Sequence, residues 1–306
     1  MFRVTVDIFS GRPNPSWMVI DQAEGAGFLK AIAEVPELIS KPDSGFGGLG
    51  YRGMTIELFG DEDASDLKLP ATFGFANMAG RNLRRAGEIA ASLIENMTKY
   101  NRISLPEHEL TPINAQIQAY CLEQLEAFVK NPPKILELPK RFPRATRKTV
   151  RDPKCDQCFY EISRFNPAFW NSDPYVQHNN NCYNYARNWR TNTFAQPGKA
   201  HGCYPYPIQC PDVTKAALCD GLKQPCDCLP NAEYPRRHMA LVIAPGIDYH
   251  WFREQIGGFW GHKPGGTPAK NTDNGGAIVT NPETANRGIY TQFCGYFYAG
   301  KSVVII

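Results

Sequence analysis

One segment of this 306-residue chain places a cysteine where proteins make thiols reactive. Cys182 follows three consecutive asparagines, which are good helix N-caps and poor helix formers. Side chains three, four and seven positions later share one face of the predicted helix, namely Tyr185, Ala186 and Trp189. The positive end of a helix favours the thiolate and lowers the pKa of a thiol. The pattern therefore predicts a helix that begins at Cys182 and makes this residue the candidate nucleophile.

A nucleophilic cysteine needs a base, and three histidines recur downstream at intervals of 12 residues, His238, His250 and His262. Each of them lies next to a predicted strand. In a β-meander with this spacing, histidines of neighbouring strands come side by side, so that one can face the thiol while the next orients it. A single histidine is more often structural, but this spacing after a helix-start cysteine favours catalysis.

This order of residues resembles the papain-like fold, and more narrowly the NlpC-type and CHAP-type cysteine peptidases and amidases. In those families a cysteine opens a helix, and a histidine and a third polar residue follow on a meander. The stretches Asp248 to Arg253 (DYHWFR) and Trp260 to Gly265 (WGHKPG) also resemble a group of bacterial proteins that we expect to share this fold. The resemblance covers about residues 155–300. It implies hydrolysis of a peptide or amide bond through a thioacyl-enzyme intermediate.

Two assignments of the histidines fit the resemblance. In the preferred one, His250 is the base and His262 orients it. In the other, His238 is the base and His250 orients it. Asn271 and Asp273 are weaker candidates for the third polar residue.

The resemblance also implies oxyanion donors and a class of substrate. Papain-like enzymes use an amide side chain shortly before the cysteine to bind the oxyanion, and Gln177 lies five positions upstream of Cys182. The Cys182 backbone N–H is the second expected donor. The expected substrate is a peptide, a protein or a peptidoglycan-like molecule, and no cofactor or catalytic metal is expected. The same machinery could pass the acyl group to an amine, as a transglutaminase-like acyltransferase does.

Eight further cysteines lie in the second half of the chain. Cys121 stands apart, on the apolar face of a predicted helix, where it is expected to be a small buried hydrophobe. The even number favours four disulfides among Cys155, Cys158, Cys203, Cys210, Cys219, Cys226, Cys228 and Cys294. The alternative is a zinc site made by Cys155 and Cys158 with Cys226 and Cys228. Disulfides would suit a secreted protein, although no signal peptide is visible, and would also fit a binding or toxin module without catalysis.

A short basic segment separates two blocks of different composition. Residues 131–154 carry five prolines with 8 basic and 2 acidic side chains, so we expect an extended interdomain linker. Residues 1–130 carry 12 basic and 17 acidic side chains and are expected to form an α+β domain that acts as a scaffold, recognition module or pro-domain. Residues 155–306 are expected to form the papain-like, cysteine-rich catalytic domain. The predicted fold class is therefore α+β.

Hydrophobic periodicity places the elements of both blocks. Strands are expected over 2–9 and 54–59, and then over 238–244, 249–254, 259–263 and 290–298. Helices are expected over 21–39 and 80–98, and a third with Thr111 as N-cap and Pro112 as its first residue. Ser10 to Pro15 (SGRPNP) is expected to be a turn.

Composition excludes several classes of function. The chain is 42% hydrophobic and 21% charged, as ordinary globular proteins are, and no run approaches the ~18 apolar residues of a membrane span. The net charge of +3 gives no reason to expect a nucleic-acid partner. The glycine-rich run at 45–50 leads into a predicted strand and lacks a lysine, so it does not predict a phosphate site.

Overall fold

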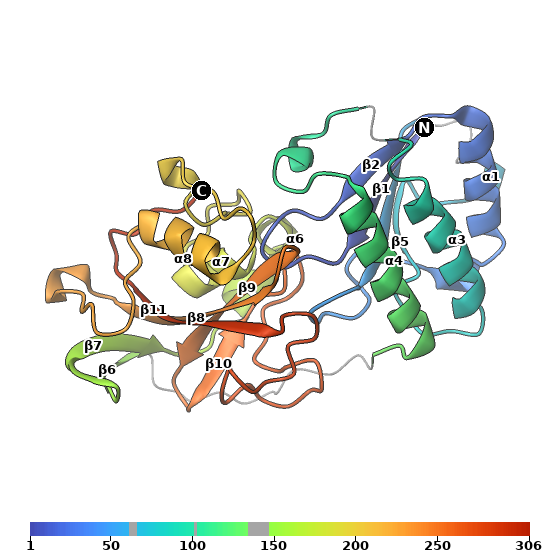
Figure 1. Ribbon diagram of the computed structural model, residues 1–306. Helices are drawn as coiled ribbons and strands as arrows, with labels where there is room; N and C mark the ends of the chain where they lie inside the picture. Colours follow the sequence, from blue (N-terminus) through green and yellow to red (C-terminus); the bar gives the residue numbers. More distant parts are fainter. Residues whose placement is uncertain (61–65, 101–102, 134–146) are drawn as a thin grey trace. The chain divides into compact units, whose positions relative to one another are not determined.

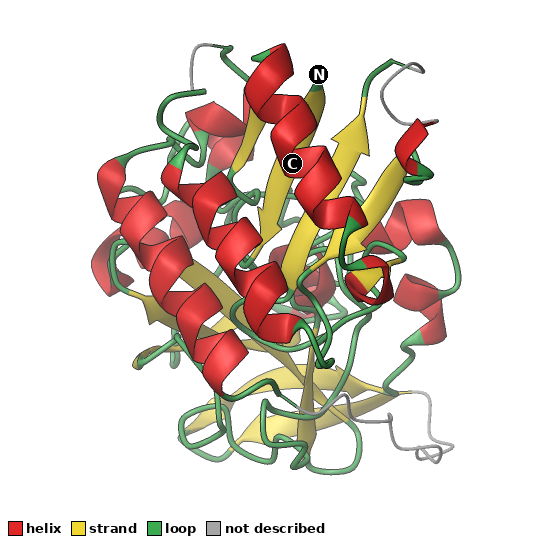
Figure 2. Ribbon diagram, turned by 90° about the vertical axis from the view of Figure 1, so that its right-hand side faces the viewer, coloured by secondary structure: helices red, strands yellow, loops and turns green. Residues whose placement is uncertain are grey.

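The computed structural model describes residues 1–60, 66–100, 103–133 and 147–306 and has the predicted α+β class (Figures 1 and 2). The chain divides into two compact units. The first comprises Met1–Phe9 and Pro13–Ile135, and the second Ser10–Arg12 and Leu136–Ile306. The short segment Ser10–Arg12 thus belongs to the second unit, although it lies near the start of the chain.

The first unit is an antiparallel sheet with the strand order β2-β1-β4-β5-β3. Its strands are β1 (Phe2–Asp7), β2 (Ser16–Val19), β3 (Ile39–Ser40), β4 (Gly53–Leu58) and β5 (Thr72–Phe75). Its helices are α1 (Gln22–Ala33), α3 (Leu83–Glu95) and α4 (Ala115–Lys130), which lie along one side of the sheet (Figure 2). Alternate residues of β1 are fully buried, which is the predicted pattern of a strand with one face in the core.

Two helices of this unit differ from the prediction at their ends. The helix expected over 21–39 ends at Ala33, and Pro36 begins a separate short 3₁₀ turn, because proline disfavours helical backbone in the residue before it. Thr111 is not the N-cap of α4. Its hydroxyl donates to the Pro13 carbonyl instead, and Asn114 caps the helix by accepting the Ile117 N–H.

The second unit is built around a sheet with the order β11-β8-β9-β7-β6, and β10 pairs with β9. Its strands are β6 (Arg147–Asp152), β7 (Cys155–Ser163), β8 (Arg237–Ala244), β9 (Asp248–Gln255), β10 (Phe259–His262) and β11 (Gln292–Ala299). The strands β8, β9 and β10 form the predicted antiparallel meander. Among the described strands, only β7 and β9 pair in parallel, at one residue pair.

Short helices cover this sheet: α5 (Ala168–Asn171), α6 (Pro174–His178), α7 (Cys182–Arg187) and α8 (Cys210–Cys219). Helices α7 and α8 pack on the same face as the alternate residues Leu241 of β8 and Trp251 of β9, in one buried apolar cluster. Further 3₁₀ turns occur in this unit at Lys199–His201 and Asn231–Glu233, and one occurs in the first unit at Pro106–Glu109. None of the helices in the described ranges is both long enough and apolar enough to cross a membrane.

The predicted linker agrees with the structure only in part. Residues 134–146 of the expected 131–154 segment lie outside the described residues. Arg147–Asp152 form β6, which pairs with β7, so this end of the segment is part of the sheet. No proline falls within 147–152, so every backbone N–H there is available to a strand ladder.

The expectation of four disulfides is confirmed. The bonded pairs are Cys155–Cys226, Cys158–Cys228, Cys203–Cys219 and Cys210–Cys294. The zinc alternative does not hold, because its four cysteines are bonded in pairs. Two of the disulfides tie β7 to the irregular chain before β8, and another ties α8 to β11. Cys121 and Cys182 are buried and lie outside these four pairs.

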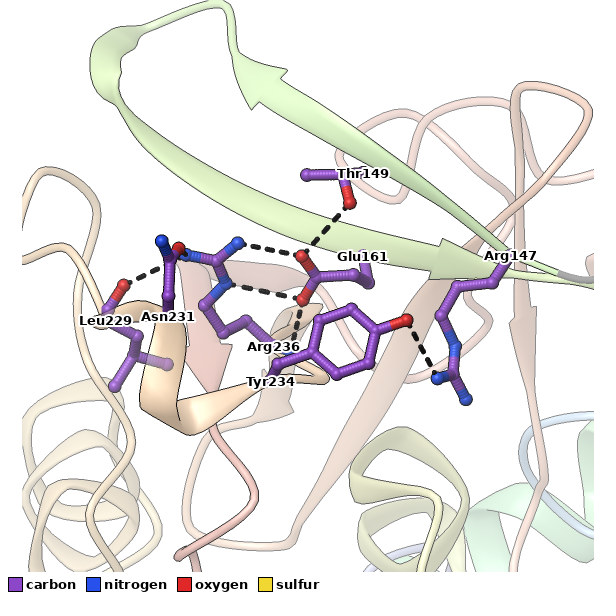
Figure 3. Close-up of polar contacts among 7 residues, drawn as sticks. All are labelled: Arg147, Thr149, Glu161, Leu229, Asn231, Tyr234 and Arg236. Carbon is purple, nitrogen blue, oxygen red and sulfur yellow. Dashed lines mark hydrogen bonds and ion pairs between the residues drawn. The ribbon is translucent and has the colours of Figure 1, made fainter.

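A buried ion pair joins β7 to the start of β8 (Figure 3). The Arg236 guanidinium donates to both carboxylate oxygens of Glu161, with the shorter contact at 2.8 Å, and the Arg236 backbone N–H donates to the same carboxylate. The side chains are only 6% and 1% exposed. Arg236 also donates to the Leu229 carbonyl and to Asn231, so the polar atoms of this pair are well satisfied.

We expect Glu161→Gln to lower the free energy of unfolding by about 3–5 kcal/mol, because it leaves the buried Arg236 charge without its anion. Chemical denaturation followed by tryptophan fluorescence measures the change. The matched control is Glu57→Gln, since the Arg3–Glu57 pair is about one-third exposed and should contribute less than ~1 kcal/mol. Equal losses in the two variants would contradict the role assigned to Glu161.

Candidate active site

Helix α7 begins at Cys182, as the sequence predicts. The Asn181 side chain caps it by accepting the N–H groups of Tyr183 and Asn184, and the Asn184 side chain accepts the Asn181 N–H in return. The helix ends at Arg187, because Asn188 adopts a left-handed conformation with φ of 60°. Local capping therefore positions the thiol at the first residue of the helix.

The thiol of Cys182 lies in the apolar core and not at an open helix end. Its complete burial raises the pKa of the thiol well above the usual value, and the carboxylate of Asp248 raises it further. The backbone N–H of Trp251 and the ammonium of Lys263 lower that pKa by smaller amounts. The expectation of a lowered thiol pKa is thus wrong for this conformation, because the cost of burying an anion exceeds the effect of one short helix.

The imidazoles of His250 and His262 come together as the preferred assignment expects. Phe252 of β9 pairs with His262 of β10, and His250 lies two residues earlier on the same face of β9. The two rings form a hydrogen bond of 2.8 Å between His250 Nε2 and His262 Nδ1, and both residues are fully buried. His250 Nδ1 lies 2.8 Å from the hydroxyl of Ser10.

The protonation of this chain of groups follows from its far end. His262 Nε2 lies 2.9 Å from the Thr272 carbonyl, which can only accept, so Nε2 carries the proton. Burial, with help from the nearby Lys270, lowers the pKa of His262 to about 3, so this ring is neutral and its Nδ1 accepts from His250 Nε2. In neutral His250, Nδ1 is then the acceptor, and the Ser10 hydroxyl donates to it. The arrangement holds the Nδ1 lone pair of a potential base against the Ser10 hydroxyl.

The buried His262 should make the stability of the protein depend on pH. A histidine with a pKa of about 3 when folded and about 6.5 when unfolded resists protonation only in the folded state. The contribution of the neutral ring to the free energy of unfolding is complete above about pH 6.5. It is lost as the pH falls from 6.5 toward 3, by up to about 1.4 kcal/mol per pH unit. We expect His262→Gln to flatten this dependence in denaturation curves measured between pH 7 and 4. Parallel curves for the two proteins would contradict the assignment.

The Cys182 thiol contacts the backbone of the same strand, β9. Tyr249 and Trp251 of β9 share the apolar cluster with Cys182, and His250 between them points to the other face of the strand. The thiol accepts the N–H of Trp251, the residue after His250. The structure therefore joins His250 to His262 through their side chains, and joins Cys182 to the same part of β9 through a main-chain hydrogen bond.

His238, the base of the alternative assignment, lies elsewhere on the meander. The register pairs Val242 with His250, so His238 lies four residues further along β8 and the two histidines are not neighbours. His238 Nδ1 instead forms a contact of 2.7 Å with Glu254. Its ring packs against four aromatic side chains, those of Tyr160, Trp260, Tyr296 and Tyr298.

The other candidates for the third polar residue do not orient an imidazole. Asn271 is buried, and its side-chain oxygen has no hydrogen-bond partner among the described residues. Asp273 holds a turn by accepting the N–H groups of Gly275 and Ala277. The second partner of His262 is the carbonyl of Thr272, the residue between these two candidates.

Gln177, the expected oxyanion donor, lies in α6. Its backbone carbonyl accepts from the ammonium of Lys263, which also donates to the carbonyls of Asn180 and Gly265. Lys263 is fully buried and lies directly after His262, so it fixes the chain before Cys182 to the end of β10. The sequence contained no periodicity that would have identified this role.

Ser10 and Asp248 are the polar residues of this site that sequence reasoning missed. The Asp248 carboxylate is fully buried, which raises its pKa, and hydrogen bonds from the Ser10 N–H and the Tyr290 hydroxyl oppose that rise. Its place at the start of β9, two residues before His250, was the available signal. Ser10 gave no such signal, because its sequence context indicates only a turn.

Within the described residues, no group of three or more His, Cys, Asp or Glu side chains could hold a metal ion.

Comparison with known proteins identifies a relative of this chain. No family model matches the chain, and no solved structure matches it. Insoluble matrix shell protein 1 of Ruditapes philippinarum is 44% identical to it over 144 residues, which are 45% of this chain and 90% of the relative. Identity at this level over nearly the whole relative shows common descent. The chain therefore belongs to the family of insoluble matrix shell protein 1.

Proposed function

We propose that the second unit is a papain-like cysteine hydrolase of the NlpC or CHAP type, which cleaves a peptide or amide bond through a thioacyl intermediate on Cys182. The observation that carries the proposal is the hydrogen bond between His250 and His262 on neighbouring strands of the meander. The Cys182 thiol hydrogen-bonds the same strand one residue after His250. Base and orienting group are thus in contact, the proposed nucleophile is bonded to the strand that carries the base, and the three follow in the chain order that this class uses.

Cys182 and the His250 ring lie on opposite faces of β9 in the resting structure, so the proposed reaction begins when they come together and the thiol gives its proton to His250 Nδ1. The thiolate attacks the substrate carbonyl, and the amine leaves with the proton returned by His250, which forms a thioester on Cys182. Water then gives a proton to His250 and attacks the thioester, which releases the carboxylic acid and restores the thiol. Throughout the reaction, His262 Nδ1 accepts a hydrogen bond from the N–H at His250 Nε2. This hydrogen bond stabilises the His250 imidazolium. The Cys182 N–H and the Gln177 side chain remain the proposed oxyanion donors.

Two observations support the proposed location. Four disulfides suit a protein that works in an oxidising compartment, so we propose that it is secreted. The relative is named as a matrix protein of the shell, which agrees with an extracellular site of action. The proposed substrates are peptides, proteins or peptidoglycan-like molecules. If an amine replaces water in the second step, the same site acts as an acyltransferase.

Trapping the intermediate tests the proposal. The full chain is incubated with a panel of peptides and peptidoglycan fragments, quenched in acid and measured by intact mass and peptide mapping. We expect an acyl adduct on Cys182 and release of an amine product. Adding a fluorescent primary amine separates hydrolysis from acyl transfer. A chain that releases no product from any substrate and carries no adduct on Cys182 would overturn the assignment.

The second candidate is a disulfide-bonded matrix module without catalysis. The name of the relative and the four disulfides favour it. It predicts that Cys182 is a packing residue, so Cys182→Ala would change only stability. The enzyme hypothesis predicts loss of product at nearly unchanged stability.

A further inference from the structure

We propose that four residues of the second unit form a binding site for peptide main chain, and that the chain's own Ser10–Arg12 segment occupies it as an internal ligand. We call these residues, Asn181, Gln196, Asp248 and Tyr249, the main-chain subsite. Its occupation excludes a substrate, so the segment must leave before the reaction of the proposed function. The role in regulation rests on that proposed function, but the binding of peptide does not.

One carboxylate binds the N–H groups of the segment. Asp248 accepts the backbone N–H of Ser10 at 2.6 Å, of Gly11 at 3.2 Å and of Arg12 at 3.1 Å. The segment thus presents three consecutive main-chain donors to a single buried anion. These hydrogen bonds involve only main-chain N–H groups of the segment, so they would be available to any peptide that adopts the same conformation.

Three donors converge on the carbonyl of Gly11. Asn181 Nδ2 donates to it at 2.6 Å, Gln196 Nε2 at 2.8 Å and the Tyr249 hydroxyl at 3.1 Å. All three donating residues are fully buried. Asn181 is the residue before Cys182, so one of the three donors directly precedes the proposed nucleophile in the chain. Several fixed donors aimed at one carbonyl oxygen are what an acyl-transfer site needs to bind its substrate.

Only glycine fits at the centre of the segment. A Cβ on Gly11 would lie 2.4 Å from the Tyr249 ring and 2.5 Å from the Tyr249 carbonyl, and the carbonyl cannot move aside. The side chain that follows, Arg12, is buried and interacts electrostatically with Asp248. The ligand class is therefore a peptide with a central glycine followed by a cationic residue.

The same segment blocks the proposed base. The Ser10 hydroxyl forms a hydrogen bond with His250 Nδ1, the nitrogen that must take the thiol proton. With that nitrogen engaged and the pKa of Cys182 raised by burial, the resting thiol stays protonated. Displacement of one segment would expose the main-chain subsite and free the base together.

Two variants of the full chain test the proposal. Gly11→Ala introduces the clash with Tyr249. Ser10→Ala removes only the Ser10 hydroxyl that is hydrogen-bonded to His250. The matched control is Gly47→Ala, since nothing lies within 4 Å of a Cβ at Gly47. The measurement is the rate at which iodoacetamide labels Cys182, mapped by mass spectrometry. We expect labelling at least tenfold faster than wild type in Gly11→Ala, a smaller increase in Ser10→Ala and no change in the control.

A free peptide separates displacement from partial unfolding. The probe has the sequence Phe-Ser-Gly-Arg-Pro, and its control has alanine in place of glycine. We expect the probe, and not its control, to bind Gly11→Ala in a fluorescence polarisation assay and to return its labelling rate toward that of wild type. Unchanged labelling in both variants, or faster labelling that the probe does not reverse, would overturn the inference.

The outcomes also distinguish this inference from the proposed function. Reversal by the probe, with no acyl adduct on Cys182 in any variant, would keep the main-chain subsite and remove the hydrolase. An acyl adduct without any effect of the probe would do the opposite.

Discussion

Cys182→Ala should reduce product formation by a factor of about 10³ or more, since the proposed reaction has no other atom that can form the acyl intermediate. The side chain is fully buried but small, so its loss should lower the free energy of unfolding by no more than about 1–2 kcal/mol. The measurement is turnover of the best substrate from the trapping panel, with thermal unfolding recorded on the same samples.

The matched control for this variant is Cys121→Ala. Cys121 is also a buried cysteine outside the four disulfides, but it lies in α4 of the first unit. Its replacement should produce a comparable change in stability and leave turnover unaffected. If the two variants lost activity to the same extent, the loss would reflect stability and Cys182 would not be the nucleophile.

His250→Gln should be as damaging to turnover as the loss of the thiol. Glutamine can keep hydrogen bonds to Ser10 and His262, but it cannot take the thiol proton. His262→Ala should leave partial activity, because an orienting group contributes less than the base. His238→Ala serves as the comparison, since His238 pairs with Glu254 and is not a neighbour of His250.

The order of these effects decides between the two assignments of the histidines. Turnover assays on the purified variants should give near-wild-type rates for His238→Ala and about a 10³-fold loss for His250→Gln. If His238→Ala were the inactive variant and His250→Gln retained partial activity, the alternative assignment would replace the preferred one. The pH dependence of kcat/KM in wild type would then report on a different imidazole.

Local features of the sequence were sufficient to predict several elements of the second unit. The start of α7 follows from the capping by Asn181 and Asn184, groups that lie within three residues of each other. The meander follows from apolar runs and a glycine turn. The contact between His250 and His262 follows from that meander, because antiparallel neighbours with a short turn bring residues 12 apart together.

Other features were decided by residues far apart in the chain. The sequence placed Cys182 at a helix start, which lowers a thiol pKa, but only the packed core showed that burial raises it instead. Ser10 lies 240 residues from His250, and no local pattern predicts their contact. Eight cysteines allow 105 pairings, so the count predicted disulfides and the tertiary structure chose the partners.

The physical reason for this division is the range of each interaction. Capping, strand alternation and turn formation depend on a few consecutive residues, so the sequence by itself determined that α7 starts at Cys182 and that β8, β9 and β10 form a meander. Burial of a thiol and occupation of a base depend on which distant segments surround them. Only the tertiary structure could therefore reveal that Ser10–Arg12 lies against Asp248 and His250.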